Sequence, residues 1–442
     1  MKKILLAFMM TAAIQGFSSI AAQLSSDEKV FSLVQETTKD VRENILSFWG
    51  KNAPDPRGGF YGTLLNDGTP LLDAPKGSVL NARILWTFSK AYELFRNEND
   101  RQMANRAQDY FMKYFIDPEY GGTYWILRSD GTVKMMDKQT YGIAFGIYAL
   151  AQHYRATGNE ESLRQAIALY HTLEEHAYDP VNGGYVESFT RDWQPPMRYG
   201  YDGKGIAPKT MNTHLHVLEA YTLLYRAWPD AGLKEQLRNL VDIFLDKIID
   251  RQRWHQRLFL TMDWKNLEEI DSYGHDMELS WLIYEAAMVL KDTFLIEEIK
   301  SVAIHLVDKQ MKEGWMPEGY LLYERAEGEI RGGIEWWPQA ESVVAFFNAW
   351  QITCEPIYLN ACIKTWNWIK AHLIDYEYGE WFGGLLPDGT PDRRRPKADL
   401  WKCPYHNSRM GFELFERIQY KGKVQYAQFL HDASEIKIME LP

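Results

Sequence analysis

The chain has 442 residues, of which 46% are hydrophobic and 25% are charged, an ordinary globular composition with ample length for a large core. Its formal net charge of -11 excludes a broad basic surface for nucleic-acid phosphates and favours a small neutral substrate. Aromatic residues make up 14%, including 16 Trp and 26 Tyr, and their flat rings with polar edges suit stacking on sugars, although most are expected in the core.

The first 22 residues, MKKILLAFMMTAAIQGFSSIAA, have the order of a secretory signal peptide: two lysines, an apolar run from Ile4 to Ile14, then small residues. We expect cleavage after Ala21 or Ala22. The apolar run is too short to span a bilayer, and no cysteine follows the cleavage region to carry a lipid. The sequence therefore predicts an exported, periplasmic protein that is not held in a membrane.

A phrase of glycine, aromatic and turn residues recurs six times along the chain. RGGFYGTLLNDGTP, YGGTYWILRSDGTV and FGGLLPDGTPD carry the Asp-Gly pair of a short hairpin turn, and NGGYVESFTRDWQP, RLFLTMDWKN and EGYLLYERAEGE are variants of the phrase. The six copies begin at residues 57, 120, 182, 257, 318 and 382. This spacing leaves room for two helices and a hairpin in each repeat.

Between these phrases the apolar residues recur at intervals of three and four, as in AIALYHTLEEHAYD, HLHVLEAYTLLYRAW and DMELSWLIYEAAMVL, which predicts helices. Six helical hairpins closed in a ring make an all-α (α/α)6 barrel of about twelve helices, with the short β-hairpins gathered at one end as the rim of a site. An open solenoid is the alternative. No linker rich in Pro, Ser or Gly interrupts the series, so residues 23–442 are predicted to form a single domain.

Two histidines lie close together in MNTHLHVLEAYTLLYRAW, residues 211–228. On a helix His214 and His216 point to opposite sides, which disfavours a metal chelate, whereas on a strand they would share a face. Asn212, His216 and Glu219 form one polar stripe on this apolar helix, which requires a polar cavity or an internal hydrogen-bond network. A core histidine with satisfied hydrogen bonds is the alternative for His216.

Two further histidines open predicted helices. His275 follows Gly274 in DSYGHDMELSWLIYEAAMVL, and His406 follows Pro404 in KADLWKCPYHNSRMGFELFERI. The positive end of the helix dipole disfavours a protonated imidazole, so we expect a neutral His275 that can accept a proton near pH 7. Because the inner helices of a closed ring run the same way, both histidines are predicted to meet in one cavity.

Arg83 lies within the apolar helix SVLNARILWTFSKAYELF, where a buried guanidinium needs a cavity, a substrate oxygen or a salt bridge to a neighbouring helix. Cys354, Cys362 and Cys403 show neither a disulfide framework nor metal-ligand spacing, and we expect them to be buried thiols. The remaining candidates are aromatic residues near the repeated phrases, for which the core is the alternative: Tyr141, Trp336, Trp337, Trp381 and Trp401.

Five stretches, NARILWTFSKAYE, MNTHLHVLEAYT, SYGHDMELSWLIYEA, EWWPQAESVVAFFNAW and KADLWKCPYHNSRMGFELFERI, resemble the cellobiose 2-epimerases within the family of N-acylglucosamine 2-epimerases. The resemblance covers essentially the whole chain after the signal peptide. It implies an (α/α)6 barrel that epimerises the reducing-end sugar of β-1,4-linked disaccharides at C2, with no metal, nucleotide or other cofactor. We expect a monomer whose partner is a small-molecule disaccharide, with no nucleic acid or membrane.

By this resemblance, His275 and His406 match the acid/base pair of the family, and Glu278 matches a carboxylate partner of the catalytic group. One turn from His275, Glu278 is expected to orient that ring. Other residues match the family's sugar-holding and sugar-stacking positions: Arg83, Asn212 and His216 for the reducing-end unit, and Trp401, Trp381 and one of Trp336 and Trp337 for stacking.

Several functions remain open at this point. Within the family, a mannobiose 2-epimerase, an N-acylglucosamine 2-epimerase or a mannose isomerase would use the same two histidines. Glycoside hydrolysis also occurs in (α/α)6 barrels, but it requires two positioned carboxylates, and the motifs here centre on histidines. A non-catalytic sugar-binding protein is disfavoured, because binding alone gives no reason for paired histidines at helix starts.

Overall fold

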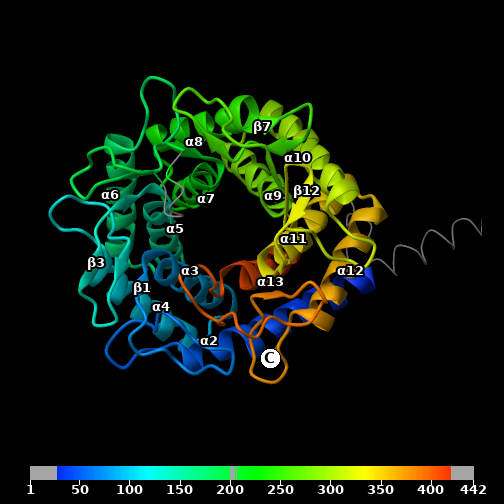
Figure 1. Cartoon of the computed structure of the whole chain (residues 1–442), viewed down its shortest axis with the longest axis horizontal. Helices are drawn as coiled ribbons and strands as arrows, with labels where there is room; N and C mark the ends of the chain where they lie inside the picture. The colour runs from blue at the N-terminus through cyan, green and yellow to red at the C-terminus, as the bar shows by residue number, and fades with distance from the viewer. Residues whose placement is uncertain (1–26, 200–204, 206, 420–442) are drawn as a thin grey trace, which may run out of the picture.

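The computed structural model describes residues 27–199, 205 and 207–419, so the predicted signal peptide lies outside the described residues. Within this part of the chain, six inner helices surround a common axis in Figure 1: α3 (Ser78–Phe95), α5 (Thr140–Thr157), α7 (Met211–Ala227), α9 (Tyr273–Leu290), α11 (Trp336–Thr353) and α13 (Tyr405–Gln419). Each packs against the next, and α13 packs against α3. The ring therefore closes, and the open solenoid is excluded.

An outer layer covers the inner ring (Figure 1). Its helices are residues 27–39 with η1 (Asp40–Ile45) and α2 (Leu46–Asn52), α4 (Glu98–Tyr110) with η2 (Phe111–Phe115), α6 (Glu160–His176), α8 (Ala231–Ile243) with η3 (Phe244–Ile248), α10 (Thr293–Glu313) and α12 (Pro356–His372). Inner and outer helices alternate along the chain. The predicted (α/α)6 barrel is confirmed.

Burial explains why the two layers differ in sequence. The inner helix α5 is buried on all sides from Thr140 to His153, so its sequence is apolar and rich in small residues. The outer helix α6 buries one stripe, Ala166, Leu169 and Leu173, and exposes its charged face. A helix covered on every side must be apolar all round, whereas a surface helix needs only one apolar stripe.

The turns between inner and outer helices repeat one capping pattern. Gly158, the residue after α5, has a φ of 75°, a left-handed conformation that glycine adopts without strain. Asn159 then caps α6 by accepting hydrogen bonds from the backbone of Glu161 and Ser162. Asn97, Asp230 and Asp292 cap α4, α8 and α10 in the same way. These short turns reverse the chain and keep successive helices antiparallel.

Short strands lie at the other end of the ring, before the inner helices. They are β1 (Lys76–Gly77), β2 (Ile126–Leu127), β3 (Val133–Met135), β4 (Lys138–Gln139), β5 (Ser188–Phe189), β6 (Lys209–Thr210), β7 (Ile249–Asp250), β8 (His255–Gln256), β9 (Phe259–Leu260), β10 (Ile270–Ser272), β11 (Glu324–Ala326), β12 (Glu329–Arg331), β13 (Ile334–Glu335) and β14 (Gly384–Leu385). At the three predicted Asp-Gly turns the glycine has a left-handed conformation, at Gly68, Gly131 and Gly389. Several strands, however, pair with the neighbouring repeat, as β4 does with β5 and β6 with β9. The pairing thus ties successive repeats together.

Four buried ion pairs reinforce this end of the ring. Lys76 contacts Asp55 at 2.8 Å, and the same lysine donates to the carbonyl of Gly58. Three further pairs have the same 2.8 Å distance: Lys138 with Asp117, Lys209 with Asp179, and Lys397 with Asp375. Each pair links the loop after an outer helix to the segment before the next inner helix. Each buried charge thus has a partner of opposite sign. The four pairs hold the segments that lead into the inner helices.

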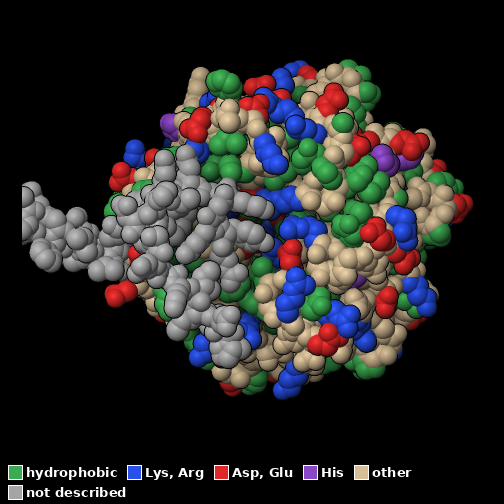
Figure 2. Space-filling view, turned by 180° about the vertical axis from the view of Figure 1, so that it is seen from behind, with side chains coloured by type: hydrophobic (Ala, Val, Ile, Leu, Met, Phe, Trp, Pro, Cys, Tyr) green, Lys and Arg blue, Asp and Glu red, His purple; other side chains and the backbone are tan. Residues whose placement is uncertain are grey.

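Cysteine placement departs in part from expectation. Cys362 and Cys403 are buried, but Cys354 is exposed, because it is the left-handed residue that ends α11. None of the helices in the described part of the chain combines the length and apolar composition that a bilayer crossing needs. Figure 2 shows the face opposite to that of Figure 1, and over its described surface Lys and Arg side chains are interspersed with Asp and Glu.

Candidate active site

A cavity of about 400 Å³ lies among the first two turns of the inner helices. Ten of the eleven side chains selected from the sequence line it: Arg83, Tyr141, Asn212, His216, His275, Glu278, Trp336, Trp337, Trp401 and His406. Three residues that the sequence did not single out complete the wall: Tyr323, Glu335 and Arg395. Side chains from all six inner helices therefore converge on one site.

Trp381 is the predicted site residue that the structure places elsewhere. Its ring is fully buried, lies 6.3 Å from the ring of Trp366, and donates a hydrogen bond of 2.8 Å from Nε1 to Asp40. Trp381 directly precedes the glycine phrase that begins at Phe382; it bridges to Ile374, and its hydrogen bond to Asp40 ties it to η1 of the outer layer. The prediction was wrong because an aromatic residue beside glycines can pack inward as well as face the rim.

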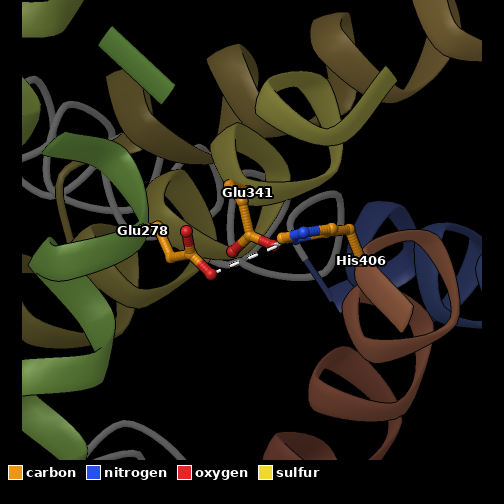
Figure 3. Close-up of side chains that lie close together, drawn as sticks. All are labelled: Glu278, Glu341 and His406. Atoms are coloured by element: carbon orange, nitrogen blue, oxygen red, sulfur yellow. Dashed lines mark hydrogen bonds and ion pairs between the residues drawn. The ribbon is translucent and has the colours of Figure 1, made fainter. Parts of the chain in front are cut away.

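His406 lies in the first turn of α13 and has a carboxylate partner. Its Nδ1 is 2.7 Å from Oε1 of Glu341 and 4.0 Å from Oε1 of Glu278 (Figure 3). Burial lowers the pKa of His406 well below its ordinary value, and the positive charges of Arg83 and Arg409 lower it further. A neutral ring that donates from Nδ1 to Glu341 has its Nε2 lone pair ready to accept a proton.

His275 lies in the first turn of α9 and has a hydroxyl partner. Its Nδ1 is 2.6 Å from Oγ of Ser272, and its ring centre is 4.7 Å from that of Trp337. Burial lowers the pKa of His275 to about 3, with a smaller contribution from His216. This lowered pKa supports the expected neutral form of His275. Its main cause is burial, and not the helix dipole that the sequence suggested.

Glu278 does not orient His275, contrary to the expectation. Its Oε1 accepts a hydrogen bond from Nη2 of Arg409, and it approaches His406 from the α9 side (Figure 3). Burial, with the nearby negative charge of Glu341, raises the pKa of Glu278 to about 7. One helical turn brings Glu278 to the same side of α9 as His275, but the guanidinium below the cavity is the stronger partner. Near neutral pH this carboxyl group can carry a proton.

Arg409, one turn after His406 on α13, joins three carboxylates beneath the cavity. Its guanidinium donates to Glu219, Glu278 and Glu341, and its carbon Cζ lies 4.8 Å from the ring centre of Trp281. Arg409 and Glu341, which the sequence patterns did not single out, carry the same signal as Arg83: a charge inside an apolar helix. One buried guanidinium thereby fixes the carboxylates that contact the histidines.

Glu278, Glu341 and His406 also form the cluster best placed to hold a metal ion among the described residues, since one ligand atom of each lies within 4.8 Å of the others. Arg409 already donates to both carboxylates from Nη2. A cation bound there would have to displace or repel a fully buried guanidinium. The donor set therefore suits proton transfer better than metal binding.

Other parts of the cavity wall carry hydrogen-bonding groups. His216 receives a carboxylate partner of its own, because its Nδ1 is 2.9 Å from Oε2 of Glu219. Arg83 is buried and donates from Nη2 to the hydroxyl of Tyr141 at 2.9 Å. Asn212 lies one turn before His216 on the cavity side of α7. These groups can hold sugar oxygens and support negative charge on them.

His214, by contrast, is a core residue. Its Nδ1 lies 2.7 Å from the carbonyl oxygen of Thr210, and its Nε2 accepts from the backbone N–H of Tyr185 at 2.9 Å. Both nitrogens are thus satisfied by the backbone, on the side of α7 away from the cavity. Because α7 is a helix, the two histidines diverge as the periodicity predicts, and they are not placed to bind one metal ion together.

The outer part of the cavity has an aromatic and charged rim. The indole of Trp401 lies 5.9 Å from the ring of Tyr141. Arg395 forms two hydrogen bonds of 2.7 Å with the carboxylate of Glu335, the residue immediately before α11. This pair holds the loop that carries Arg395 against the mouth of the cavity. A rim of this composition offers both stacking surfaces and hydrogen-bonding groups beyond the histidines.

Comparisons with known proteins identify the family. The family model for N-acylglucosamine 2-epimerase (GlcNAc 2-epimerase) matches residues 59–407. A cellobiose 2-epimerase of Bacteroides fragilis is 43% identical over 86% of this chain and 98% of its own length, and one of Dictyoglomus turgidum is 36% identical over 87% and 99%.

A solved structure gives the same result for the fold. The cellobiose 2-epimerase from Bacillus thermoamylovorans B4167 superposes with a TM-score of 0.84 and 38% identity, covering 87% of this chain and 99% of that one. The range matched by the family model, residues 59–407, contains the residues that line the cavity, including both histidines at its inner end. On these grounds the chain is an enzyme that belongs to the N-acylglucosamine 2-epimerase family.

Proposed function

We propose that this enzyme epimerises C2 of the reducing-end glucose or mannose of β-1,4-linked disaccharides such as cellobiose. One observation carries the proposal: two neutral histidines from different helices, His275 and His406, line one cavity, and the ring of Trp337 packs against both, at 4.7 Å and 5.5 Å. Relatives named cellobiose 2-epimerases at 43% and 36% identity support the choice of a disaccharide.

The reaction needs three steps. The sugar ring opens, which places an aldehyde beside C2 and makes the C2 proton acidic. Nε2 of one histidine removes that proton and leaves a planar enediolate. The other histidine, which takes up a proton from solvent before this step, then delivers that proton to the opposite face of C2, so one ring gains a proton, the other loses one, and exchange with solvent restores both. Positioned imidazoles are well suited to this transfer.

Negative charge on the enediolate oxygens must be supported during the reaction. Arg83, Asn212 and His216 line the wall where such oxygens would lie and can donate hydrogen bonds or positive charge. Glu278, with a pKa raised by burial to about 7, can carry a proton at neutral pH and is placed to exchange it with a sugar oxygen. These residues serve the unit that reacts.

The second sugar unit would occupy the rim. Trp401, Tyr323 and the Glu335 and Arg395 pair line the cavity beyond the histidines and provide a stacking surface and hydrogen-bonding groups. A monosaccharide would leave them unused. This is the feature that favours a disaccharide over the monosaccharide substrates of an N-acylglucosamine 2-epimerase or mannose isomerase.

Product analysis tests the proposal. The purified enzyme is incubated separately with cellobiose, mannobiose, glucose and mannose, and the products are identified by NMR. We expect conversion of the disaccharides to their C2 epimers, with kcat/KM well above that for either monosaccharide. A ketose product would indicate proton return to C1 and an isomerase, and preference for a monosaccharide would contradict the proposed role of the rim.

The two-histidine step has its own test in deuterated water. His275→Asn and His406→Asn should each reduce epimerisation by at least about 10²-fold. Each variant should still wash deuterium into one sugar, glucose-type for one variant and mannose-type for the other, because one base remains. Near-normal epimerisation by either variant, or wash-in to both sugars by one variant, would contradict the assignment.

A further inference from the structure

Ser272, the last residue of β10, occupies the capping position of α9 without capping it. A serine there ordinarily accepts a hydrogen bond from a backbone N–H of the first helical turn. Thr210, at the same position of α7, does so by accepting from the N–H of Thr213 at 3.1 Å. Ser272 makes no such bond; its hydroxyl is 2.6 Å from Nδ1 of His275. The hydroxyl of Ser272 therefore contacts the imidazole of His275, and not the backbone N–H groups at the start of α9.

The backbone holds this hydroxyl in place. Ser272 is 3% exposed and pairs in register with Glu324 of β11. The preceding residue, Asp271, forms ion pairs with Arg253 at 2.7 Å and Arg325 at 2.8 Å. Strand pairing on one side and two arginines on the other therefore fix the position from which Ser272 reaches the ring.

The opposite face of His275 is also fixed. Its ring lies against Trp337, and the close approach of that indole requires Gly274, where a Cβ would come within 2.6 Å of the ring. With Nδ1 held by Ser272 and one ring face covered, Nε2 is the nitrogen left to point into the cavity. A hydroxyl can accept from Nδ1–H whether the ring is neutral or protonated, so the same hydrogen bond serves both forms.

We propose that Ser272 is the positioning residue of His275, and that the site holds its two histidines with partners of unlike charge: a neutral hydroxyl for His275 and the carboxylate of Glu341 for His406. The inference rests on the proposed two-histidine function. Ser272 contacts the ring of His275, whereas the ring of His406 is held by Glu341. Ser272 should therefore matter for one face of C2 only.

Exchange measurements in single-base backgrounds test this directly. His406→Asn leaves His275 as the working base, and His275→Asn leaves His406. Adding Ser272→Ala to the first background should lower deuterium wash-in by about tenfold or more, the scale found for residues that orient catalytic ligands. Adding it to the second should change wash-in by less than about twofold. Ser272→Thr, which keeps the hydroxyl, should restore most of the exchange.

Two controls separate positioning from damage to the fold. In the otherwise unchanged enzyme, Ser272→Ala should lower kcat and leave KM within about twofold, because Ser272 does not line the cavity. Thr210→Ala removes a true helix cap; it should lower the midpoint of thermal unfolding and affect both exchange rates equally.

The outcomes are distinct. An equal fall in deuterium wash-in in both backgrounds would overturn the role of Ser272. So would an unchanged wash-in when Ser272→Ala is added to His406→Asn. Absence of wash-in to either sugar in the His406→Asn variant of an active enzyme would overturn the two-histidine reaction itself.

Discussion

Arg409 and Glu341 meet at the oxygen that also serves His406: Oε1 of Glu341 lies 2.7 Å from Nη2 of Arg409 and 2.7 Å from Nδ1 of His406. The guanidinium favours the ionised carboxylate, and the carboxylate in turn fixes the histidine as an Nδ1 donor. Removing either partner would leave a buried charge without compensation, which is costly in a protein interior.

Replacing the buried arginine should destabilise the protein strongly. Arg409→Met keeps the volume but leaves Glu219, Glu278 and Glu341 facing one another without a cation. We expect a loss of about 3 to 5 kcal/mol in the free energy of unfolding, measured by urea denaturation at pH 7. Arg394→Met, at a side chain 80% exposed, is the control and should change stability by no more than about 0.5 kcal/mol. Similar losses for both variants would contradict the network.

Glu341→Gln tests the carboxylate that orients His406. The amide keeps the shape and removes the charge that stabilises the imidazolium. We expect kcat for epimerisation to fall by about 10- to 100-fold, with KM little changed because Glu341 does not line the cavity. Steady-state kinetics with cellobiose at several concentrations provide the measurement. A large rise in KM at constant kcat would show that Glu341 serves substrate binding instead.

The core histidine should affect stability, with a definite pH dependence. Burial lowers the pKa of His214 to about 4, below its value of about 6.5 in the unfolded chain. Between these two pKa values the imidazole is protonated in the unfolded chain and neutral in the folded one. The free energy of unfolding therefore decreases as pH falls from about 6.5 towards 4. His214→Gln removes this effect. Its stability deficit relative to the parent should narrow by about 1 to 2 kcal/mol between pH 7.5 and pH 5 in urea denaturation.

The same variant provides a contrast in activity. His214→Gln, on the side of α7 away from the cavity, should keep kcat/KM within about threefold at temperatures where it remains folded. His216→Gln, two residues away and facing the cavity, should lose activity by about tenfold or more. Equal losses in the two variants would mean that both rings act together, as a metal chelate would require.

Chelators should leave the activity unchanged. Two carboxylates of the candidate cluster are bound to Arg409, and the site's donors suit proton transfer. Prolonged dialysis against EDTA, followed by assay with cellobiose, is the measurement. Activity that disappears on dialysis and returns with zinc or manganese would show that a metal takes part.

The N-terminal segment should be removed during export. We propose that residues 1–22 direct the protein to the periplasm and that the mature chain begins near Ala22 or Gln23. Mass spectrometry of protein from periplasmic and cytoplasmic fractions of a Gram-negative expression host checks the prediction. Intact Met1 on soluble cytoplasmic protein, with none in the periplasm, would contradict it.

Much of the architecture follows from local patterns. Apolar spacing of three and four residues gave the helices, the recurrent glycine phrases gave their grouping in pairs, and six pairs close a ring. The divergence of His214 and His216 also follows from the sequence, because the helical rotation of 200° over two residues depends on nothing outside α7. Local backbone geometry decides such features, and the sequence determines it directly.

Partner choice among buried groups was decided by the tertiary structure. Glu278 is one turn from His275 along α9, yet it pairs with Arg409 of α13, and Ser272 holds the imidazole. Trp381 resembles a rim residue and is buried against Trp366. Charges and aromatic rings in a closed barrel pair with whichever side chain the neighbouring helix brings within reach. Sequence spacing fixes directions along one helix, but the distances between helices arise only when the ring closes.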